Sequence, residues 1–249
     1  RIRRRHYGQV QAMMGGQLVD VSDETITTAN TGEALAGSAY LVYGIEAFGL
    51  TLRPGIRTEI VHTSLDEGDS VQEETRAIAL PGIGLTYAIT PTLSAVGGVH
   101  RGFSPVAPGQ ASTIEPETSV SYELGARFLE GANDIEVIGF VNDYQNLQGQ
   151  CAFSTGCTED MLDVQFNAGN VLVWGVEAVA AWTFQLPGQF VLPARLSYTY
   201  TDSEQKTGEY KGEPLNKIPE HMANANLDWQ ANNRLNLWFQ ANYRGETSD

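Results

Sequence analysis

The sequence has no hydrophobic run long enough to cross a membrane as a helix, which requires about 20 apolar residues. The longest candidate, residues 171–182, is interrupted by Glu177. Basic residues are also scarce, since 15 Lys and Arg stand against 30 Asp and Glu and the formal net charge is −15 at pH 7. A chain this acidic cannot neutralise a run of phosphates, so we expect no nucleic-acid partner. The charge does not exclude a membrane protein, because the lumen and outer loops of a β-barrel are polar.

The sequence also lacks a recognisable catalytic pattern. It contains neither a Ser-His-Asp arrangement nor an HExxH motif, and Gly97-Gly98 is not followed by the GK[ST] of a phosphate-binding loop. We therefore predict that the protein is not an enzyme and that it holds no metal centre or cofactor. The four histidines are scattered along the chain: His6, His62, His100 and His221.

Cysteine is almost absent. Cys151 and Cys157 lie in one short segment rich in turn-forming residues, QCAFSTGCTED. Two cysteines this close, in a protein expected to face outward, favour a disulfide that closes a loop. A pair of free thiols is the alternative, and metal binding lacks nearby histidine partners.

Alternation of apolar and polar residues is the dominant pattern, and it predicts β-strands. In residues 172–182 one face is apolar and carries Trp174 and Trp182. At about 3.3 Å per residue and roughly 40° of tilt, these two rings would lie about 20 Å apart along a membrane normal. That separation suits aromatic girdles on either side of a hydrocarbon band. Near the N-terminus the pattern is weaker, and we expect one strand in residues 5–18 followed by a loop in residues 19–37.

Short turns alternate with long polar loops along the chain. The loops are expected at residues 62–74, 102–118 and 201–219 and around the cysteines. One strand face is rich in Leu, Ile, Tyr and Trp, and the other in Asn, Gln, Ser, Thr and Arg. Both features predict an all-β, antiparallel transmembrane β-barrel of about 11 strands, since a soluble sandwich would not expose so apolar a face. The short turns are centred near Phe48, Pro91, Gly131, Gly188 and Asn232.

The ends of the chain suggest a piece of a larger protein. The first residues, RIRRRH, are followed by polar sequence without the apolar core of a signal peptide, and the last residues come just after a predicted strand. We expect residues 1–249 to form one partial transmembrane β-barrel domain.

Three short motifs lie near the centre of this pattern. Their residues are Gly102, Phe103, Ser104 and Pro105, then Glu115, Pro116, Glu117 and Thr118, then Tyr122, Glu123, Leu124 and Gly125. These motifs resemble the "GFSP" and "KPE-T/S…YELG" signature of TonB-dependent outer-membrane receptors, with Glu115 where that family usually has Lys. The resemblance extends more weakly over nearly the whole chain, and within the family the pattern is most similar to that of ferric-citrate receptors.

The resemblance implies about half of a barrel of roughly 22 strands, without the plug that fills its lumen. It also implies a bacterial outer-membrane location and active import of a ferric chelate, a siderophore and possibly ferric citrate, through a TonB-gated barrel. The TonB complex would act through an N-terminal part that these residues do not contain. Outer-membrane lipid and lipopolysaccharide are further expected partners. Cobalamin, haem and glycans remain open as substrates, and a passive porin or structural barrel is the alternative function.

Candidate ligand contacts lie where a predicted strand emerges toward the GFSP motif. Arg101 could pair with the carboxylates of an anionic chelate, with His100 beside it, because a guanidinium matches carboxylate geometry. A neighbouring acid is the alternative partner of Arg101. By alternation Arg127 and Arg195 face the lumen, where we expect salt bridges within the wall, with Glu123 as a partner of Arg127 or of a residue across a strand.

Overall fold

The computed structural model describes residues 2–8, 11–14, 17–20, 25–109, 114–150, 165–186, 190–208, 210–232 and 235–247. These residues form strands joined by turns and loops, and none of them forms a helix long and apolar enough to cross a membrane. Cys151 and Cys157 lie outside the described residues, so the predicted disulfide stays a prediction.

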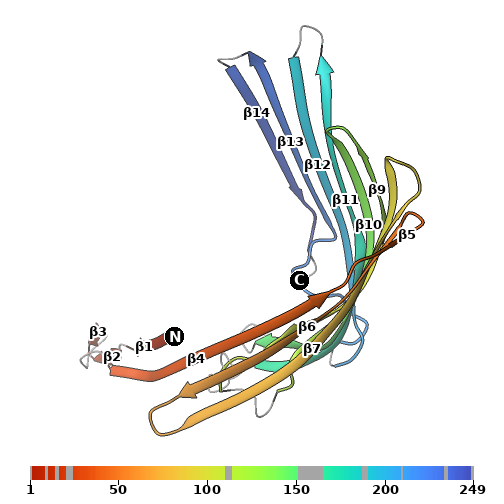
Figure 1. The fold of residues 1–249 in the computed structure, drawn as a ribbon. Coiled ribbons are helices and arrows are strands. Elements are labelled where there is room, and N and C mark those ends of the chain that lie inside the picture. The colour runs from red at the N-terminus through yellow and green to blue at the C-terminus, as the bar shows by residue number, and fades with distance from the viewer. Residues whose placement is uncertain are drawn as a thin grey trace.

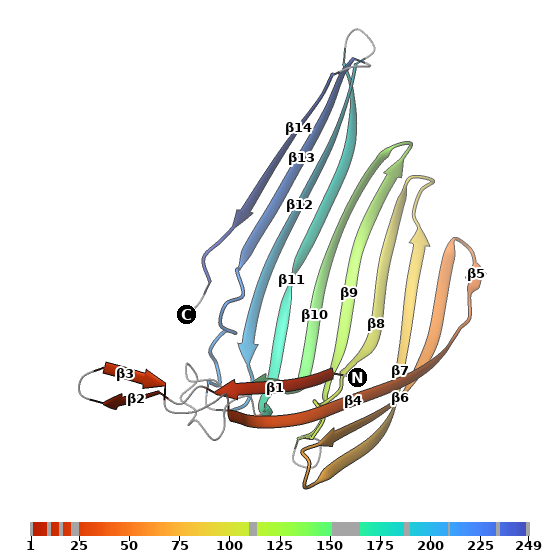
Figure 2. The same ribbon diagram turned by 90° about the vertical axis from the view of Figure 1, so that its left-hand side faces the viewer.

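A single curved, antiparallel sheet of 12 strands makes up almost the whole structure (Figures 1 and 2). Its order is β1-β4-β6-β7-β8-β9-β10-β11-β12-β13-β14, with β5 pairing to β6, while β2 and β3 form a separate hairpin. The sheet is open, as the sequence predicts for a partial barrel. The strands are β1 (Ile2–Gly8), β2 (Gln11–Met14), β3 (Gln17–Asp20), β4 (Thr25–Val42), β5 (Ile45–Ala47), β6 (Leu50–Asp66), β7 (Val71–Ala88), β8 (Leu93–Ser104), β9 (Glu117–Glu130), β10 (Asn133–Gln150), β11 (Gln165–Leu186), β12 (Phe190–Gln205), β13 (His221–Asn232) and β14 (Leu235–Arg244).

Successive strands are joined by short turns at one end of the sheet. The turn between β5 and β6 is made by Phe48 and Gly49, both with positive φ (52° and 78°), as a tight two-residue hairpin requires. At the β7–β8 turn, the hydroxyl of Thr90 accepts hydrogen bonds from the backbone N–H groups of Thr92 (3.3 Å) and Leu93 (3.0 Å). Gly131, with φ of 60°, lies in the β9–β10 turn. These three predicted turns are confirmed.

Two predicted loops are wrong, because strand pairing continues beyond the alternating pattern. Residues 62–74 are mostly strand: β6 and β7 stay paired up to Asp66 and Val71, and only residues 67–70 connect them. Residues 19–37 are not one loop, since β4 begins at Thr25 and pairs with both β1 and β6. Residues 5–18 are likewise divided among β1, β2 and β3. Where both faces of a strand are solvated, apolar alternation is no longer needed, yet backbone hydrogen bonds still hold the strands together.

The register places the apolar side chains of neighbouring strands on one face, which we call the outer face. The opposite, inner face carries most of the polar and charged wall residues, together with a few rings such as Phe140 and Trp238. One register row of the outer face runs Leu52, Leu85, Gly97, Leu124, Gly139, Val176, Tyr200 and His221. An adjacent inner-face row runs Arg53, Gly84, Gly98, Glu123, Phe140, Gly175 and Thr201.

Among the described residues, no protein layer covers the outer face. Leu124 is 70% exposed, and Phe239 (59%) and Tyr198 (38%) are exposed on the same face. A continuous apolar face of this size is not stable in water, whereas in hydrocarbon it is favourable, and sheets cross membranes as barrels. Phe128 and Trp182 stack on this face with ring centroids 6.5 Å apart, toward the short turns, as an aromatic girdle would.

Candidate functional site

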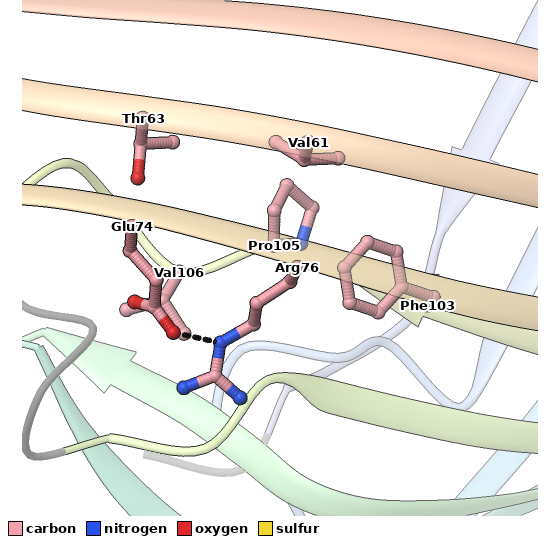
Figure 3. Close-up of a pocket in the computed structure, with 7 residues that line it drawn as sticks. All are labelled: Val61, Thr63, Glu74, Arg76, Phe103, Pro105 and Val106. Carbon is pink, nitrogen blue, oxygen red and sulfur yellow. Dashed lines mark hydrogen bonds and ion pairs between the residues drawn. The ribbon is translucent and has the colours of Figure 1, made fainter.

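At the end of the sheet opposite the short turns, the last residues of β8 and the segment that follows them fold back over the inner face of β6 and β7. We call residues 103–109 the strap. Phe103, Pro105 and Val106 of the strap lie against Val61 and Thr63 of β6 and against Glu74 and Arg76 of β7 (Figure 3). Val61, Thr63 and Val106 are buried, which is rare in this open structure. The contact leaves a void of only about 10 Å³, about the size of one water, so it is a packed joint and not a ligand pocket.

The strap continues from β7 across β6 toward β4. Gly109 lies directly over Leu65 of β6, and Pro108 lies beside Gly32 of β4. Gly109 has φ of +84°, and a Cβ there would overlap the Leu65 side chain. Both the backbone conformation and the close approach therefore require glycine at this position. The GFSP motif thus begins a brace that ties β8 to the inner faces of three earlier strands.

An ion pair lies beneath the strap. The guanidinium of Arg76 donates to the carboxylate of Glu74, two residues earlier on the same face of β7 (Figure 3). The other Glu74 oxygen is buried, with no hydrogen-bond partner among the described residues. The pair neutralises two charges next to the apolar side chains of the joint.

The second motif forms hydrogen bonds between strands at the same end of the sheet. Glu115 accepts from the side-chain amide of Asn146 (3.2 Å), and Glu117 accepts from the backbone N–H of Gln148 (3.2 Å). Asn146 adopts a positive φ of 55° at a bulge in β10, and its backbone N–H donates to the side chain of Asn170 (3.4 Å). The backbone N–H of Asn170 donates in turn to the hydroxyl of Thr207 (2.8 Å). The chain of hydrogen bonds from Glu115 through Asn146 and Asn170 to Thr207 links the segment just before β9 to the β12–β13 loop.

The third motif belongs to the wall. Tyr122 and Leu124 lie on the outer face, whereas Glu123 and Gly125 lie on the inner face. A Cβ at Gly125 would overlap the carbonyl oxygen of Val137 and the backbone of the next residue on β10. Backbone atoms cannot move aside as a flexible side chain can, so the close approach of β9 and β10 explains the glycine of the YELG motif.

Comparison with known proteins agrees with this architecture. Residues 4–249 match the family model described as "TonB dependent receptor-like, beta-barrel". The chain belongs to this family. Its place is therefore the bacterial outer membrane, and the family is one of receptors and transporters rather than enzymes.

Similar proteins carry names linked to iron. The chain is 33% identical over 184 residues to the iron-regulated outer membrane virulence protein of Vibrio cholerae serotype O1, covering 64% of the chain and 28% of that protein. It is 30% identical over 140 residues to the ferric enterobactin receptor PirA of Pseudomonas aeruginosa, covering 53% of the chain and 17% of PirA. The crystal structure of the unliganded ferric citrate transporter FecA matches with a TM-score of 0.72 and 21% identity, covering 92% of the chain and 35% of FecA. The chain thus spans less than a third of the length of the Vibrio cholerae protein and of PirA.

The receptor's two candidate ligand contacts do not share a face. His100 pairs in register with Gly82 and Ser121 and lies on the inner face, whereas Arg101 follows Val99 onto the outer face. Arg101 is exposed and has no ion-pair or hydrogen-bond partner among the described residues. The sheet therefore does not bring the two side chains to one site.

Of the two salt bridges predicted in the wall, that of Arg127 is present with a different partner, whereas Arg195 has no ion-pair partner among the described residues. Arg127 donates two hydrogen bonds to Asp134, at 2.7 and 3.2 Å, and approaches Glu136 at 3.9 Å. The expectation that Glu123 pairs with Arg127 is wrong, since Glu123 lies four residues away on the same strand while Asp134 and Glu136 lie across the β9–β10 hairpin. Cross-strand neighbours are closer than residues at that spacing within one strand.

Sequence reasoning missed the residues that complete the strap joint and the hydrogen-bonded chain. Val61, Thr63 and Arg76 give no local signal, because they meet the strap only after the chain has passed through one or two further strands. Asn146 gives a weak signal, since Asn favours the left-handed conformation that a bulge needs.

Proposed function

We propose that this barrel is part of a receptor that binds a ferric chelate at the cell surface and imports it across the outer membrane. The supporting observation is the family match over residues 4–249, together with the iron-linked names of its relatives. A siderophore is the proposed ligand class, with ferric citrate as one member to be tested. The TonB complex would supply energy through a plug segment outside residues 1–249.

The inner face suits a hydrated passage, because its wall residues are mainly polar. Ligand-binding loops would extend from the end of the sheet opposite the short turns. There the strands are held by the strap and by the chain of hydrogen bonds from Glu115 to Thr207. Loops bind best when a rigid scaffold positions them. His100 lies on this inner face near the strap and is the wall residue that we propose as a ligand contact. Arg101 as a ligand contact stays a prediction.

Uptake of radiolabelled iron tests the proposal. A strain that lacks the receptor would be compared with the complemented strain for ferric citrate, a ferric catecholate and a ferric hydroxamate. We expect uptake of at least one chelate to depend on the receptor and to stop when a protonophore is added or TonB is removed. Uptake that persists without energy would favour the porin, and no receptor-dependent uptake of any chelate would refute the proposal.

Variants then test the ligand contact. We expect His100→Gln to raise the chelate concentration for half-maximal uptake by about tenfold, the effect of one lost contact of about 1.4 kcal/mol. Thr86→Ala, also on the inner face but nearer the short turns, is the matched control. Equal uptake constants for the two variants would remove His100 from the binding site.

A further inference from the structure

The inner face around His100 is polar but uncharged. In the register, His100 lies between Gly82 of β7 and Ser121 of β9, and Ser121 pairs with Asn142 of β10. A Cβ at Gly82 would lie 3.1 Å from the Cβ of His100, so the glycine leaves room beside the imidazole. Hydroxyl, amide and imidazole groups can each donate and accept hydrogen bonds. We call His100, Ser121 and Asn142 the neutral row.

Three arginines lie near the neutral row on the side of the strap. Arg57 of β6 pairs with Glu59 at 2.8 Å. Arg76 of β7 pairs with Glu74 beneath the strap (Figure 3). Arg101 of β8 lies on the outer face of the sheet. Each of these guanidinium groups is therefore either offset by a carboxylate or faces away from the neutral row.

Carboxylates flank the neutral row along β9. Glu123 lies on the inner face on the side of the short turns, and Glu117 lies on the same face on the side of the strap. Neither has an ion-pair partner among the described residues, and Glu117 accepts a hydrogen bond from the backbone N–H of Gln148. Nearer the short turns, Arg53 lines the same hollow as Glu123 and Glu136, so carboxylates outnumber the cation there too.

The segments at the end of the sheet opposite the short turns are acidic. Residues 62–75 contain five acids and no Lys or Arg, residues 102–118 contain two acids and no Lys or Arg, and residues 201–220 contain five acids and three Lys. Arg244, an inner-face cation at this end, lies on β14 and not beside the neutral row. Negative charge at the mouth of a passage lowers the local concentration of anions and raises that of cations.

We propose that the neutral row selects a ferric chelate without net negative charge, a ferric hydroxamate rather than a ferric catecholate or ferric citrate. Singly charged hydroxamate groups balance the charge of ferric iron, and a protonated amine can make the complex cationic. Doubly charged catecholates and the carboxylates of citrate leave the complex anionic, so Glu117 and Glu123 would repel it. The inference rests on the proposed function, because it names the ligand class of the same site.

Chelate binding to the purified full-length receptor tests this inference. The probes are the hydroxamates ferrichrome and ferrioxamine B, the catecholate ferric enterobactin, and ferric citrate, with dissociation constants measured by quenching of tryptophan fluorescence. We expect the better hydroxamate to bind about tenfold more tightly than either anionic chelate, a difference of about 1.4 kcal/mol. Equal or tighter binding of an anionic chelate overturns the inference and leaves the import proposal intact. Absence of binding by every chelate refutes both.

A cation added to the neutral row tests its position. Ser121→Lys places an ammonium group beside His100, and we expect it to narrow the preference for the hydroxamate about fivefold by attracting the anionic chelates. Ser197→Lys is the matched control, since Ser197 is also a half-buried serine of the inner face but lies on β12, between Val179 and Asn224. A narrowed preference in Ser121→Lys alone supports the inference. No change in Ser121→Lys, or an equal change in both variants, overturns it.

Discussion

We call the end of the sheet that carries the strap the rim. There Val106 of the strap packs against Val61 and Thr63 of β6, a strand much earlier in the sequence. In the wall beside the short turns, Arg127 and Asp134 meet across one hairpin, seven residues apart, and both remain exposed. The rim is thus stabilised by buried contacts between distant segments, whereas the wall is stabilised by strand register and local pairs. Substitutions at the rim should therefore change the stability of the strap and leave the rest of the barrel unaffected. In the wall, substitutions should lower stability strongly only where a side chain would collide with the backbone.

The largest expected effect is in the wall. Gly125→Val places a side chain against the backbone of β10 at Val137. Because backbone atoms cannot move aside, we expect the overpacking to cost about 3 kcal/mol, the upper end of the usual range, and to impair barrel assembly. The measurement is the folded, heat-modifiable band of the full-length receptor on gels without boiling.

Gly84→Val is the control for this prediction. It lies on the same inner face, but a Cβ at Gly84 would meet nothing within 4 Å, so this variant should assemble normally. Normal assembly of Gly125→Val would show that β9 and β10 can separate at that point, and the explanation of the motif glycine would be wrong.

Phe103→Ala tests the rim. Phe103 is only partly buried, so its truncation should cost about 2 kcal/mol, below the 3–5 kcal/mol of a fully buried ring. If the strap opens independently of the barrel, its open population should rise by roughly 30-fold, and a protease should cleave near it faster by a similar factor. The barrel itself should keep its melting temperature. A large fall in melting temperature would mean that the rim and the wall unfold together.

The wall could be predicted from sequence, and the rim could not. Alternation in β8 to β14 fixes which side chains face lipid, and the turn residues Phe48, Gly49 and Gly131 mark the hairpins, so strand order follows from neighbours along the chain. Apolar alternation stops in the ends of β4, β6 and β7 opposite the short turns, so it predicts loops there, although the strands stay paired. The GFSP motif indicated a family, but nothing in its residues indicates that Val61 and Leu65 lie beneath it. His100 and Arg101 are adjacent in sequence, and only strand geometry separates them.

A smaller effect is expected at the bulge that joins the rim to the wall. Asn146→Ala removes the amide that donates to Glu115 and leaves a left-handed backbone that Ala adopts poorly, a combined cost of about 1–2 kcal/mol. Asn146→Gly removes the same hydrogen bond but tolerates the backbone, so it should lose less. Hydrogen exchange of the amide of Gln148, which donates to Glu117, measures both. Faster exchange in the Gly variant than in the Ala variant would refute the assigned role of the positive φ.

The smallest effect is expected from the ion pair of Arg127. Because Arg127 and Asp134 are exposed, water and salt screen their attraction, and Arg127→Gln should lower the melting temperature by less than about 2 °C. The same variant also tests whether Asp134 or Glu123 is the ion-pair partner of Arg127. If Asp134 is the partner, Asp134→Asn should have no further effect in the Arg127→Gln background, because the interaction is already lost, whereas Glu123→Gln should have the same effect in both backgrounds. The reverse result would return Glu123 to the pairing expected from sequence and would mean that the β9–β10 register differs from the one described.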